Sequence, residues 1–291
     1  MTQPSPPLTD LLRSASVRKH SMSDSIVNAR LVTVLVDRVL YARALSCFYW
    51  ILSRIESELN HAAETDQRTP TSDMNKLISY ILFRHMNAGL VPFVTASTPL
   101  FRRDAIAQDL EYYLGPDWKR DAEKHSLSYV QAYLERLDYI SSNKDVSILL
   151  AAHAFTQHQA FASGGRILAS RVIPKGLGLD PHSTDGRKAF QYSSGDDAYV
   201  RAQRESVKCA LDDLGKHMSD QEKELFVKEH CLVFTMNNTI VTSFRVGWLN
   251  PLRAGMTFVS KALLSSPLGW MTVGVAVSVA LYRYYYTSTI H

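Results

Sequence analysis

Residues 149–168 read LLAAHAFTQHQAFASGGRIL, and the prediction of the fold starts from them. They lie inside a helical pattern of apolar residues that runs from Asp145 to Val172 and is interrupted by Gly164-Gly165. Each glycine inside a helix costs about 1 kcal/mol of stability relative to alanine, so we expect the pair to be needed for packing or for binding. The pattern therefore predicts one long helix with a kink at the two glycines.

Three small residues before the kink share one helix face. Ala160, Ser163 and Gly164 follow the spacing i, i+3 and i+4, which places them in one strip. Such a strip allows either a second helix or a flat ligand to approach the backbone closely. The strip alone favours neither close helix packing nor a ligand-binding wall.

Helical patterns continue on both sides of this stretch. Gly115-Pro116 is typical of a helix end, and Ser219-Asp220-Gln221-Glu222 is a capping-box pattern at a helix start. Two polar segments, 61–73 and 175–194, indicate loops, and no alternating strand pattern recurs. Apolar periodicity predicts a helix that begins at residue 8 and further helices at 32–59, 75–85, 106–113, 126–137, 197–214 and 219–244. The sequence therefore predicts an all-α protein with a flexible start, 1–7, and one compact helical domain, 8–249.

The end of the chain has a different composition. Residues 262–282 read ALLSSPLGWMTVGVAVSVALY, which is 21 residues without a charge, bounded by Lys261 and Arg283. About 20 apolar residues span the hydrocarbon layer of a bilayer. A buried core helix is the alternative, but the segment is terminal and apolar on all sides. We predict a linker over 250–261, one transmembrane helix over 262–282 and a short polar tail over 283–291.

Composition excludes some classes of function. The 32 basic and 28 acidic residues leave a formal charge of +4 that is dispersed, so no general nucleic-acid surface is indicated. Cys47, Cys209 and Cys231 are far apart and odd in number, which favours a reducing compartment over a secreted disulfide framework. The segment 1–7 lacks the apolar core of a secretory signal.

Candidate binding residues lie near the N-terminus. Arg13 precedes His20 by seven residues, roughly 10 Å along a helix, and Asp24 follows His20 by four, so the three share a face. An imidazole can bind a metal, an arginine can hold a carboxylate, and an aspartate can set the imidazole tautomer through water. A surface histidine beside an aspartate is the commoner origin of this pattern. Arg204 and Lys208 are a second possible carboxylate site, although a solvated helix face explains them more simply.

Several ordered motifs together resemble one family. LLRSASVRKH at 11–20, QDLEYYLGPDW at 108–118, AHAFT at 152–156 and SGG at 163–165 are similar to the eukaryotic haem oxygenases. Phe234 and Asn237 resemble the FxxN motif of that family's last soluble helix. The similarity runs from about residue 8 to 244, and a hydrophobic C-terminal tail also occurs in the family.

The resemblance implies a reaction and a set of partners. Haem would be both substrate and cofactor, and O2 with electrons from NADPH would convert it to biliverdin, carbon monoxide and ferrous iron. NADPH-cytochrome P450 reductase would supply the electrons. The tail would place the protein on the endoplasmic reticulum, with the helical domain in the cytoplasm; the mitochondrial outer membrane is the alternative.

The resemblance also implies residue roles. His20 would be the axial ligand of the haem iron. Ala160, Ser163 and Gly164 would form the distal wall, with Ser163 and Gly164 taking part in the chemistry. The haem propionates would be held by Arg13, Arg204 and Lys208, with Arg201 in reserve.

The distal motif departs from the family pattern. Where the family has GDLSGG, residues 160–165 read AFASGG, so Ala160 replaces a glycine and Phe161 replaces the aspartate that orders water. Fungal relatives show a comparable loss. Phe161 either faces the pocket as part of the catalytic site or points into the core. A haem sensor or sink without turnover is therefore the alternative function.

Two further alternatives remain. A di-iron oxygenase on a similar fold needs paired Glu-x-x-His motifs, and only Glu58 and His61 have that spacing. A purely structural membrane adaptor would not require His20.

Overall fold

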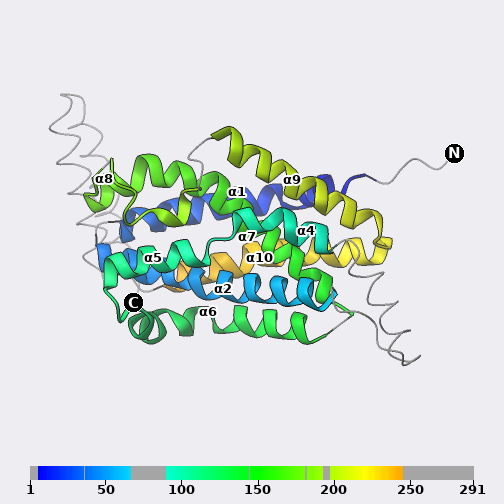
Figure 1. Ribbon diagram of the computed structural model, residues 1–291, viewed down its shortest axis with the longest axis horizontal. Coiled ribbons are helices and arrows are strands. Elements are labelled where there is room, and N and C mark those ends of the chain that lie inside the picture. Colours follow the sequence, from blue (N-terminus) through cyan, green and yellow to red (C-terminus); the bar gives the residue numbers. More distant parts are fainter. Residues whose placement is uncertain are drawn as a thin grey trace, which may run out of the picture.

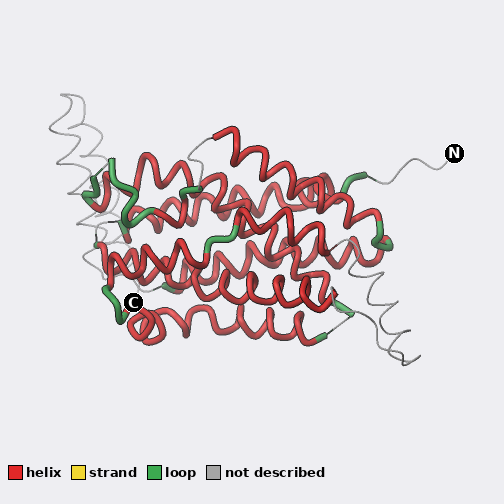
Figure 2. Tube along the Cα trace, viewed as in Figure 1, coloured by secondary structure: helices red, strands yellow, loops and turns green. Residues whose placement is uncertain are grey.

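The described part of the chain consists of helices joined by loops and turns, with no strand among these residues (Figures 1 and 2). The computed structural model describes residues 6–35, 37–66, 90–143, 145–180, 182–192 and 197–244. The α-helices are α1 (Leu8–Val34), α2 (Arg38–Asp66), α4 (Leu90–Ser97), α5 (Arg103–Leu114), α6 (Trp118–Ser142), α7 (Leu150–Ala160), α8 (Ile173–Leu177), α9 (Asp197–Lys216) and α10 (Asp220–Ser243). Short 3-10 helices are η1 (Thr98–Leu100), η2 (Ser147–Leu149) and η5 (Lys188–Phe190), and π-helical turns are η3 (Phe161–Gly165) and η4 (Leu168–Val172). The predicted all-α class is confirmed for these residues.

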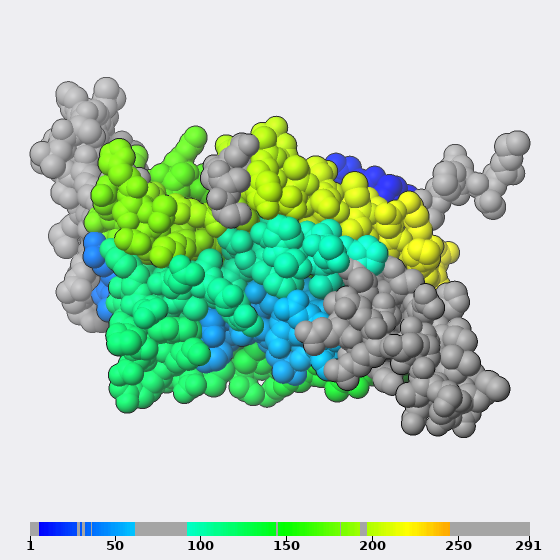
Figure 3. Space-filling model, viewed as in Figure 1, coloured from blue at the N-terminus to red at the C-terminus, as the bar shows by residue number. Residues whose placement is uncertain are grey.

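The long helices pack side by side around one hydrophobic core. α1 lies along α10, α2 lies between α5 and α6, and α4 packs on α9 (Figure 1). In the space-filling view α4 and α5 lie in front of part of α2 (Figure 3). α7 contacts both α2 and α10, so it connects the group of α2, α5 and α6 with the pair of α1 and α10. The largest fully buried side chains include Tyr133, Phe93, Phe226, Leu8, Leu12, Ile51 and Leu52.

Two predicted helix ends are confirmed. Gly115 ends α5 with a φ of +80°, a conformation that glycine adopts readily, and its N–H donates to the Glu111 carbonyl. At the start of α10 the Ser219 N–H donates to the Glu222 carboxylate at 2.7 Å, and the Glu222 N–H donates to the Ser219 hydroxyl at 3.3 Å. This capping box satisfies backbone donors that have no partner inside the helix.

Other helix boundaries were predicted wrongly. α1 continues to Val34, past Asp24, the last residue that the sequence pattern places on it, and α2 starts at Arg38 instead of residue 32. The middle of α1, which reads RKHSMSDS at 18–25, is polar, but contacts with α10 hold the helix at this stretch and beyond it: Lys19 Nζ donates to the Cys231 carbonyl at 3.3 Å, and Arg30 donates to the Thr242 carbonyl at 3.1 Å. Tertiary packing thus outweighs the weak local signal.

Several predictions lie outside the described residues. They are the helix at 75–85, the linker at 250–261, the transmembrane helix at 262–282 and the tail at 283–291. Among the helices of the described ranges, none combines the length and apolar character needed to span a bilayer.

The predicted kink is built from π-helical turns. α7 passes directly into η3, which contains Gly164 and Gly165, and the chain continues through η4. A π-turn adds a residue to a helix and is frequent at functional sites. A Cβ added at Gly165 would lie 2.5 Å from the Phe190 ring, so this position requires glycine for close packing.

The two glycines provide a matched test of this packing. We expect Gly165→Ala to lower stability by about 1–3 kcal/mol, since the added methyl group collides with a buried ring. A Cβ at Gly164 meets no atom within 4 Å, so Gly164→Ala is expected to preserve or slightly raise stability. Urea denaturation of the ligand-free variants measures both effects. Equal stability of the two variants would contradict the contact.

Candidate functional site

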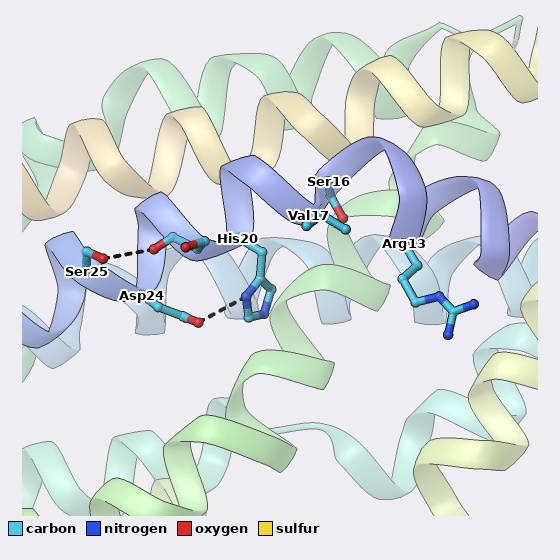
Figure 4. Close-up of a pocket in the computed structure, with 7 residues that line it drawn as sticks. Arg13, Ser16, Val17, His20, Asp24 and Ser25 are labelled. Atoms are coloured by element: carbon cyan, nitrogen blue, oxygen red, sulfur yellow. Dashed lines mark hydrogen bonds and ion pairs between the residues drawn. The ribbon is translucent and has the colours of Figure 1, made fainter.

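An open cleft of about 440 Å³ lies along one face of α1 (Figure 4). Its volume is in the range of small-molecule sites, about 300–1,000 Å³. Val17 is 63% exposed there and provides an apolar surface beside His20. The lining residues are Arg13, Ser16, Val17, His20, Ser21, Asp24 and Ser25. The predicted grouping of Arg13, His20 and Asp24 on one face is therefore confirmed.

The geometry of His20 suits a metal ligand. Its side chain is 61% exposed, and Nδ1 lies 3.0 Å from Asp24 Oδ2 (Figure 4). The nearby carboxylate favours the tautomer with the proton on Nδ1, which leaves the lone pair of a neutral imidazole on Nε2. The contact is direct and differs in this from the water-mediated one that the sequence suggests. A carboxylate that orients an imidazole in this way also makes it a stronger metal ligand.

Aromatic side chains support His20 from behind. The ring of Phe234 on α10 lies 5.7 Å from that of His20, and the His230 ring lies 5.2 Å from Phe234. The Thr156 hydroxyl donates to the Ala152 carbonyl at 2.7 Å, so it accepts from His230 Nδ1 at 2.8 Å. Burial, and then the nearby His20, lower the pKa of His230 to about 4, so His230 is neutral near pH 7.

The strip of small residues lies on an open face. Ala160 and Gly164 are exposed, and no described atom lies within 4 Å of a Cβ built at Gly164. Ser163 is half-buried, and its hydroxyl donates to the Gln159 carbonyl at 2.6 Å. Of the two interpretations of the strip, the structure therefore favours an open wall over close helix packing.

Phe161 points into the core. Its side chain is 6% exposed, stacks on Phe190 with centroids 5.1 Å apart, and meets Phe48 edge-on at 6.0 Å. Asp109 holds η5, and with it Phe190, by accepting from the N–H groups of Lys188 and Ala189, both at 2.8 Å. Of the two orientations considered for Phe161, the structure shows the inward one, so the ring lies outside the exposed strip.

The three predicted carboxylate-binding cations have different surroundings. Arg13 pairs with Asp10 at 3.1 Å and Lys208 with Glu205 at 2.6 Å, each within its own helix. Arg204 instead reaches from α9 to α7, where its Nε donates to Gln159 Oε1 at 2.8 Å. The structure therefore places Arg204 beside the strip. The reserve residue, Arg201, is exposed on α9.

A buried polar network was missed by sequence reasoning. His153 Nε2 lies 2.8 Å from Glu229 Oε1, and Nδ1 lies 2.9 Å from the Tyr133 hydroxyl. Arg136 donates twice to the Glu229 carboxylate, at 2.9 and 2.5 Å. Burial alone would raise the pKa of Glu229, but the hydrogen bonds from His153 and Arg136 outweigh it and lower the pKa to about 2.

The network continues toward the C-terminal part of α10. Gln157 Nε2 donates to Asn237 Oδ1 at 2.8 Å and to the Tyr133 hydroxyl at 3.1 Å. It therefore ties α7 to both α6 and α10. His153 and Asn237 belong to motifs noted in the sequence, but their partners are far away along the chain, so their spacing could not reveal the network. Among the described residues, no group of three or more His, Cys, Asp or Glu side chains is arranged to hold a metal ion.

Sequence comparisons identify relatives. The protein-family model described as "Heme oxygenase" matches residues 82–243, more than half of the chain. The "Heme oxygenase" of Porphyra purpurea is 26% identical over 231 residues, which cover 79% of this chain and 83% of that protein. That of Guillardia theta is 26% identical over 239 residues, covering 82% and 86%.

Solved structures show the same fold. The structure of heme oxygenase 2 from Chlamydomonas reinhardtii without heme matches with a TM-score of 0.66 and 29% identity, covering 84% of this chain and 100% of that one. Heme oxygenase-2 from Synechocystis in complex with heme and NO matches with a TM-score of 0.63 and 20% identity, covering 81% and 84%. Together with the cleft of α1 and the kinked wall helix, these matches show that the chain belongs to the haem oxygenase family.

Proposed function

We propose that this chain binds haem between the cleft face of α1 and the strip Ala160–Gly164, and cleaves it to biliverdin. The observation that carries the proposal is His20, whose Nδ1 is held by Asp24 while Nε2 remains available as a ligand. Family membership supports the activity, because its members are enzymes that open the haem ring.

The residues of the cleft fit a haem. His20 would bind the iron, and Val17 would contact the ring through its exposed apolar side chain. At the strip, Ala160 and Gly164 would leave space for a flat macrocycle, since an added Cβ at Gly164 meets no described atom. When bound, haem supplies the iron at which O2 is activated.

The polar groups of the strip are candidates for ordering water beside the haem. Phe161 lies in the core and cannot hydrogen-bond to water, so it cannot replace the family's aspartate. The Ser163 hydroxyl donates to the Gln159 carbonyl and retains lone pairs that accept a hydrogen bond. We assign to Ser163, and to the backbone around Gly164, the ordering of water at this wall.

The remaining elements of the proposal rest on the sequence. Arg13, Arg204 and Lys208 would hold the propionates, and O2 and NADPH-derived electrons would enter through NADPH-cytochrome P450 reductase. The uncharged segment 262–282 supports a membrane anchor, because its length suits a bilayer. An anchored domain would share the surface of the endoplasmic reticulum with its reductase; the mitochondrial outer membrane is the alternative location.

A reconstituted reaction tests the function. Hemin is added to the full-length protein in detergent, and the absorption spectrum is recorded before and after reductase and NADPH are supplied. We expect a Soret band on binding, followed by its loss, the appearance of biliverdin and the release of carbon monoxide. If hemin binds and is reduced but no biliverdin forms, the protein is a haem sensor or sink.

A further inference from the structure

The side-chain amide of Gln159 on α7 makes two hydrogen bonds to Arg204 on α9, one to its side chain and one to its backbone. Arg204 Nε donates to Gln159 Oε1 at 2.8 Å, and Gln159 Nε2 donates back to the Arg204 carbonyl at 3.4 Å. Both ends of the amide therefore contact the same residue. Gln159 directly precedes Ala160, and its carbonyl accepts the Ser163 hydroxyl, so the contact lies at the edge of the exposed strip.

The chemistry of this contact preserves the charge of Arg204. A neutral amide orients the guanidinium through Nε without cancelling its charge. A carboxylate would orient the guanidinium and also neutralise it. Arg13 and Lys208 each face a carboxylate of their own helix. Within the described ranges, the hydrogen bonds of the Arg204 side chain use Nε, which leaves both terminal amino groups for an anion.

Arg204 lies near two other arginines. Burial raises the pKa of Tyr192 to about 12, while the charges of Arg102, Arg166 and Arg204 act on it in the opposite direction. Arg166 is paired with Asp197, and Arg102 donates to the carbonyls of Leu100, Gln191 and Pro99. Among these three arginines, Arg204 is the one that, within the described residues, has neither a carboxylate partner nor acceptors for its terminal amino groups.

We propose that Gln159 is a positioning residue: it fixes the guanidinium of Arg204 at the edge of the wall, so that one haem propionate is bound in one orientation. This inference rests on the proposed function. A planar guanidinium held through Nε can offer both terminal amino groups to one carboxylate. The orientation of the propionate decides which edge of the ring lies against the strip, so Gln159 acts on the choice of biliverdin isomer through Arg204.

The first test measures binding without turnover. Hemin and its dimethyl ester, in which both propionates are esterified, are titrated into the full-length wild type, Gln159→Leu and Arg204→Gln. We expect Arg204→Gln to weaken hemin binding about tenfold, Gln159→Leu to weaken it severalfold, and neither to alter binding of the ester. In the double variant, Gln159→Leu should add no further loss, because its effect acts through Arg204.

A charge variant and a matched control sharpen the test. Gln159→Glu keeps an acceptor for Nε but cancels the charge of Arg204, so it should weaken hemin binding at least as much as Gln159→Leu. Gln131 is an exposed glutamine on α6 whose amide donates to Glu135, and Gln131→Leu should behave as wild type. Thermal midpoints of the ligand-free proteins identify any variant that fails to fold.

The second test measures the product isomers. We expect a mixture of biliverdin isomers from Gln159→Leu and from Arg204→Gln, and an unmixed product from Gln131→Leu. Wild-type affinity and isomers in Gln159→Leu, with both changed in Arg204→Gln, would overturn the positioning role alone. Equal weakening of hemin and its ester by Gln159→Leu would also overturn it, as a general structural effect. Failure of the proposed function is distinct, since the wild type itself would then make no biliverdin.

Discussion

The His20→Ala variant is expected to lose the wild-type Soret band and spin state. Nδ1 of His20 is held by Asp24, so Nε2 is the atom available to the iron, and alanine removes it. Haem would still enter the cleft through apolar contact with Val17. We expect hemin affinity to fall at least about tenfold, because removing a residue that only orients a metal ligand already lowers metal affinity by that factor. Absorption titration with hemin measures both changes.

Two further variants test the specificity of this result. His217 is an exposed histidine beyond the end of α9, so His217→Ala should keep the wild-type spectrum. Asp24→Asn leaves the imidazole in place but removes its charged partner, and it should give an intermediate loss of affinity. A wild-type spectrum from His20→Ala would show that another residue binds the iron.

Glu229→Ala should lower the stability of the ligand-free protein more than Gly165→Ala does. The Glu229 carboxylate is buried and accepts hydrogen bonds from Arg136 and His153. Its removal leaves those two groups without their acceptor, and breaking a buried pair in this way costs about 3–5 kcal/mol. Urea denaturation of the ligand-free protein measures the loss. Glu224→Ala, on the exposed side of α10, removes only a contact with Lys228 and should leave the unfolding midpoint unchanged.

The same network predicts a pH dependence. The pKa of Glu229 is lowered to about 2 from a usual 4.5, so its stabilising effect is complete above about pH 4.5 and is lost as the pH falls toward 2. Burial also lowers the pKa of His153, so the stability that comes from its neutral form declines below about pH 6.5. The stability difference between wild type and Glu229→Ala should therefore shrink on acidification. A difference that is constant down to pH 2 would contradict the charged contact.

Loss of this network should also affect the cleft. Glu229 and His230 are neighbours on α10, and His230 supports Phe234 behind His20. His153 lies on α7, which leads into the wall of small residues. The network therefore ties α7, which leads into the wall, to α10, which supports His20.

Local patterns in the sequence determined the helical class, the kink and the candidate ligand face. Helical periodicity depends on residues three and four apart, and so does the grouping of Arg13, His20 and Asp24 on α1. Gly164-Gly165 marked the kink, and Ser219 with Glu222 marked a helix start, because glycine and capping residues act within one turn. The ordered motifs indicated the family, which the comparisons show.

Tertiary structure alone decided the features that depend on distant partners. Local sequence left both orientations of Phe161 open, and the choice was made by Phe48 on α2 and Phe190 in η5. The length of α1 was decided by its contacts with α10, and the placement of Arg204 by an amide on α7. In each case the competing local conformations differ little in free energy, and burial or hydrogen bonding across the bundle selects one of them.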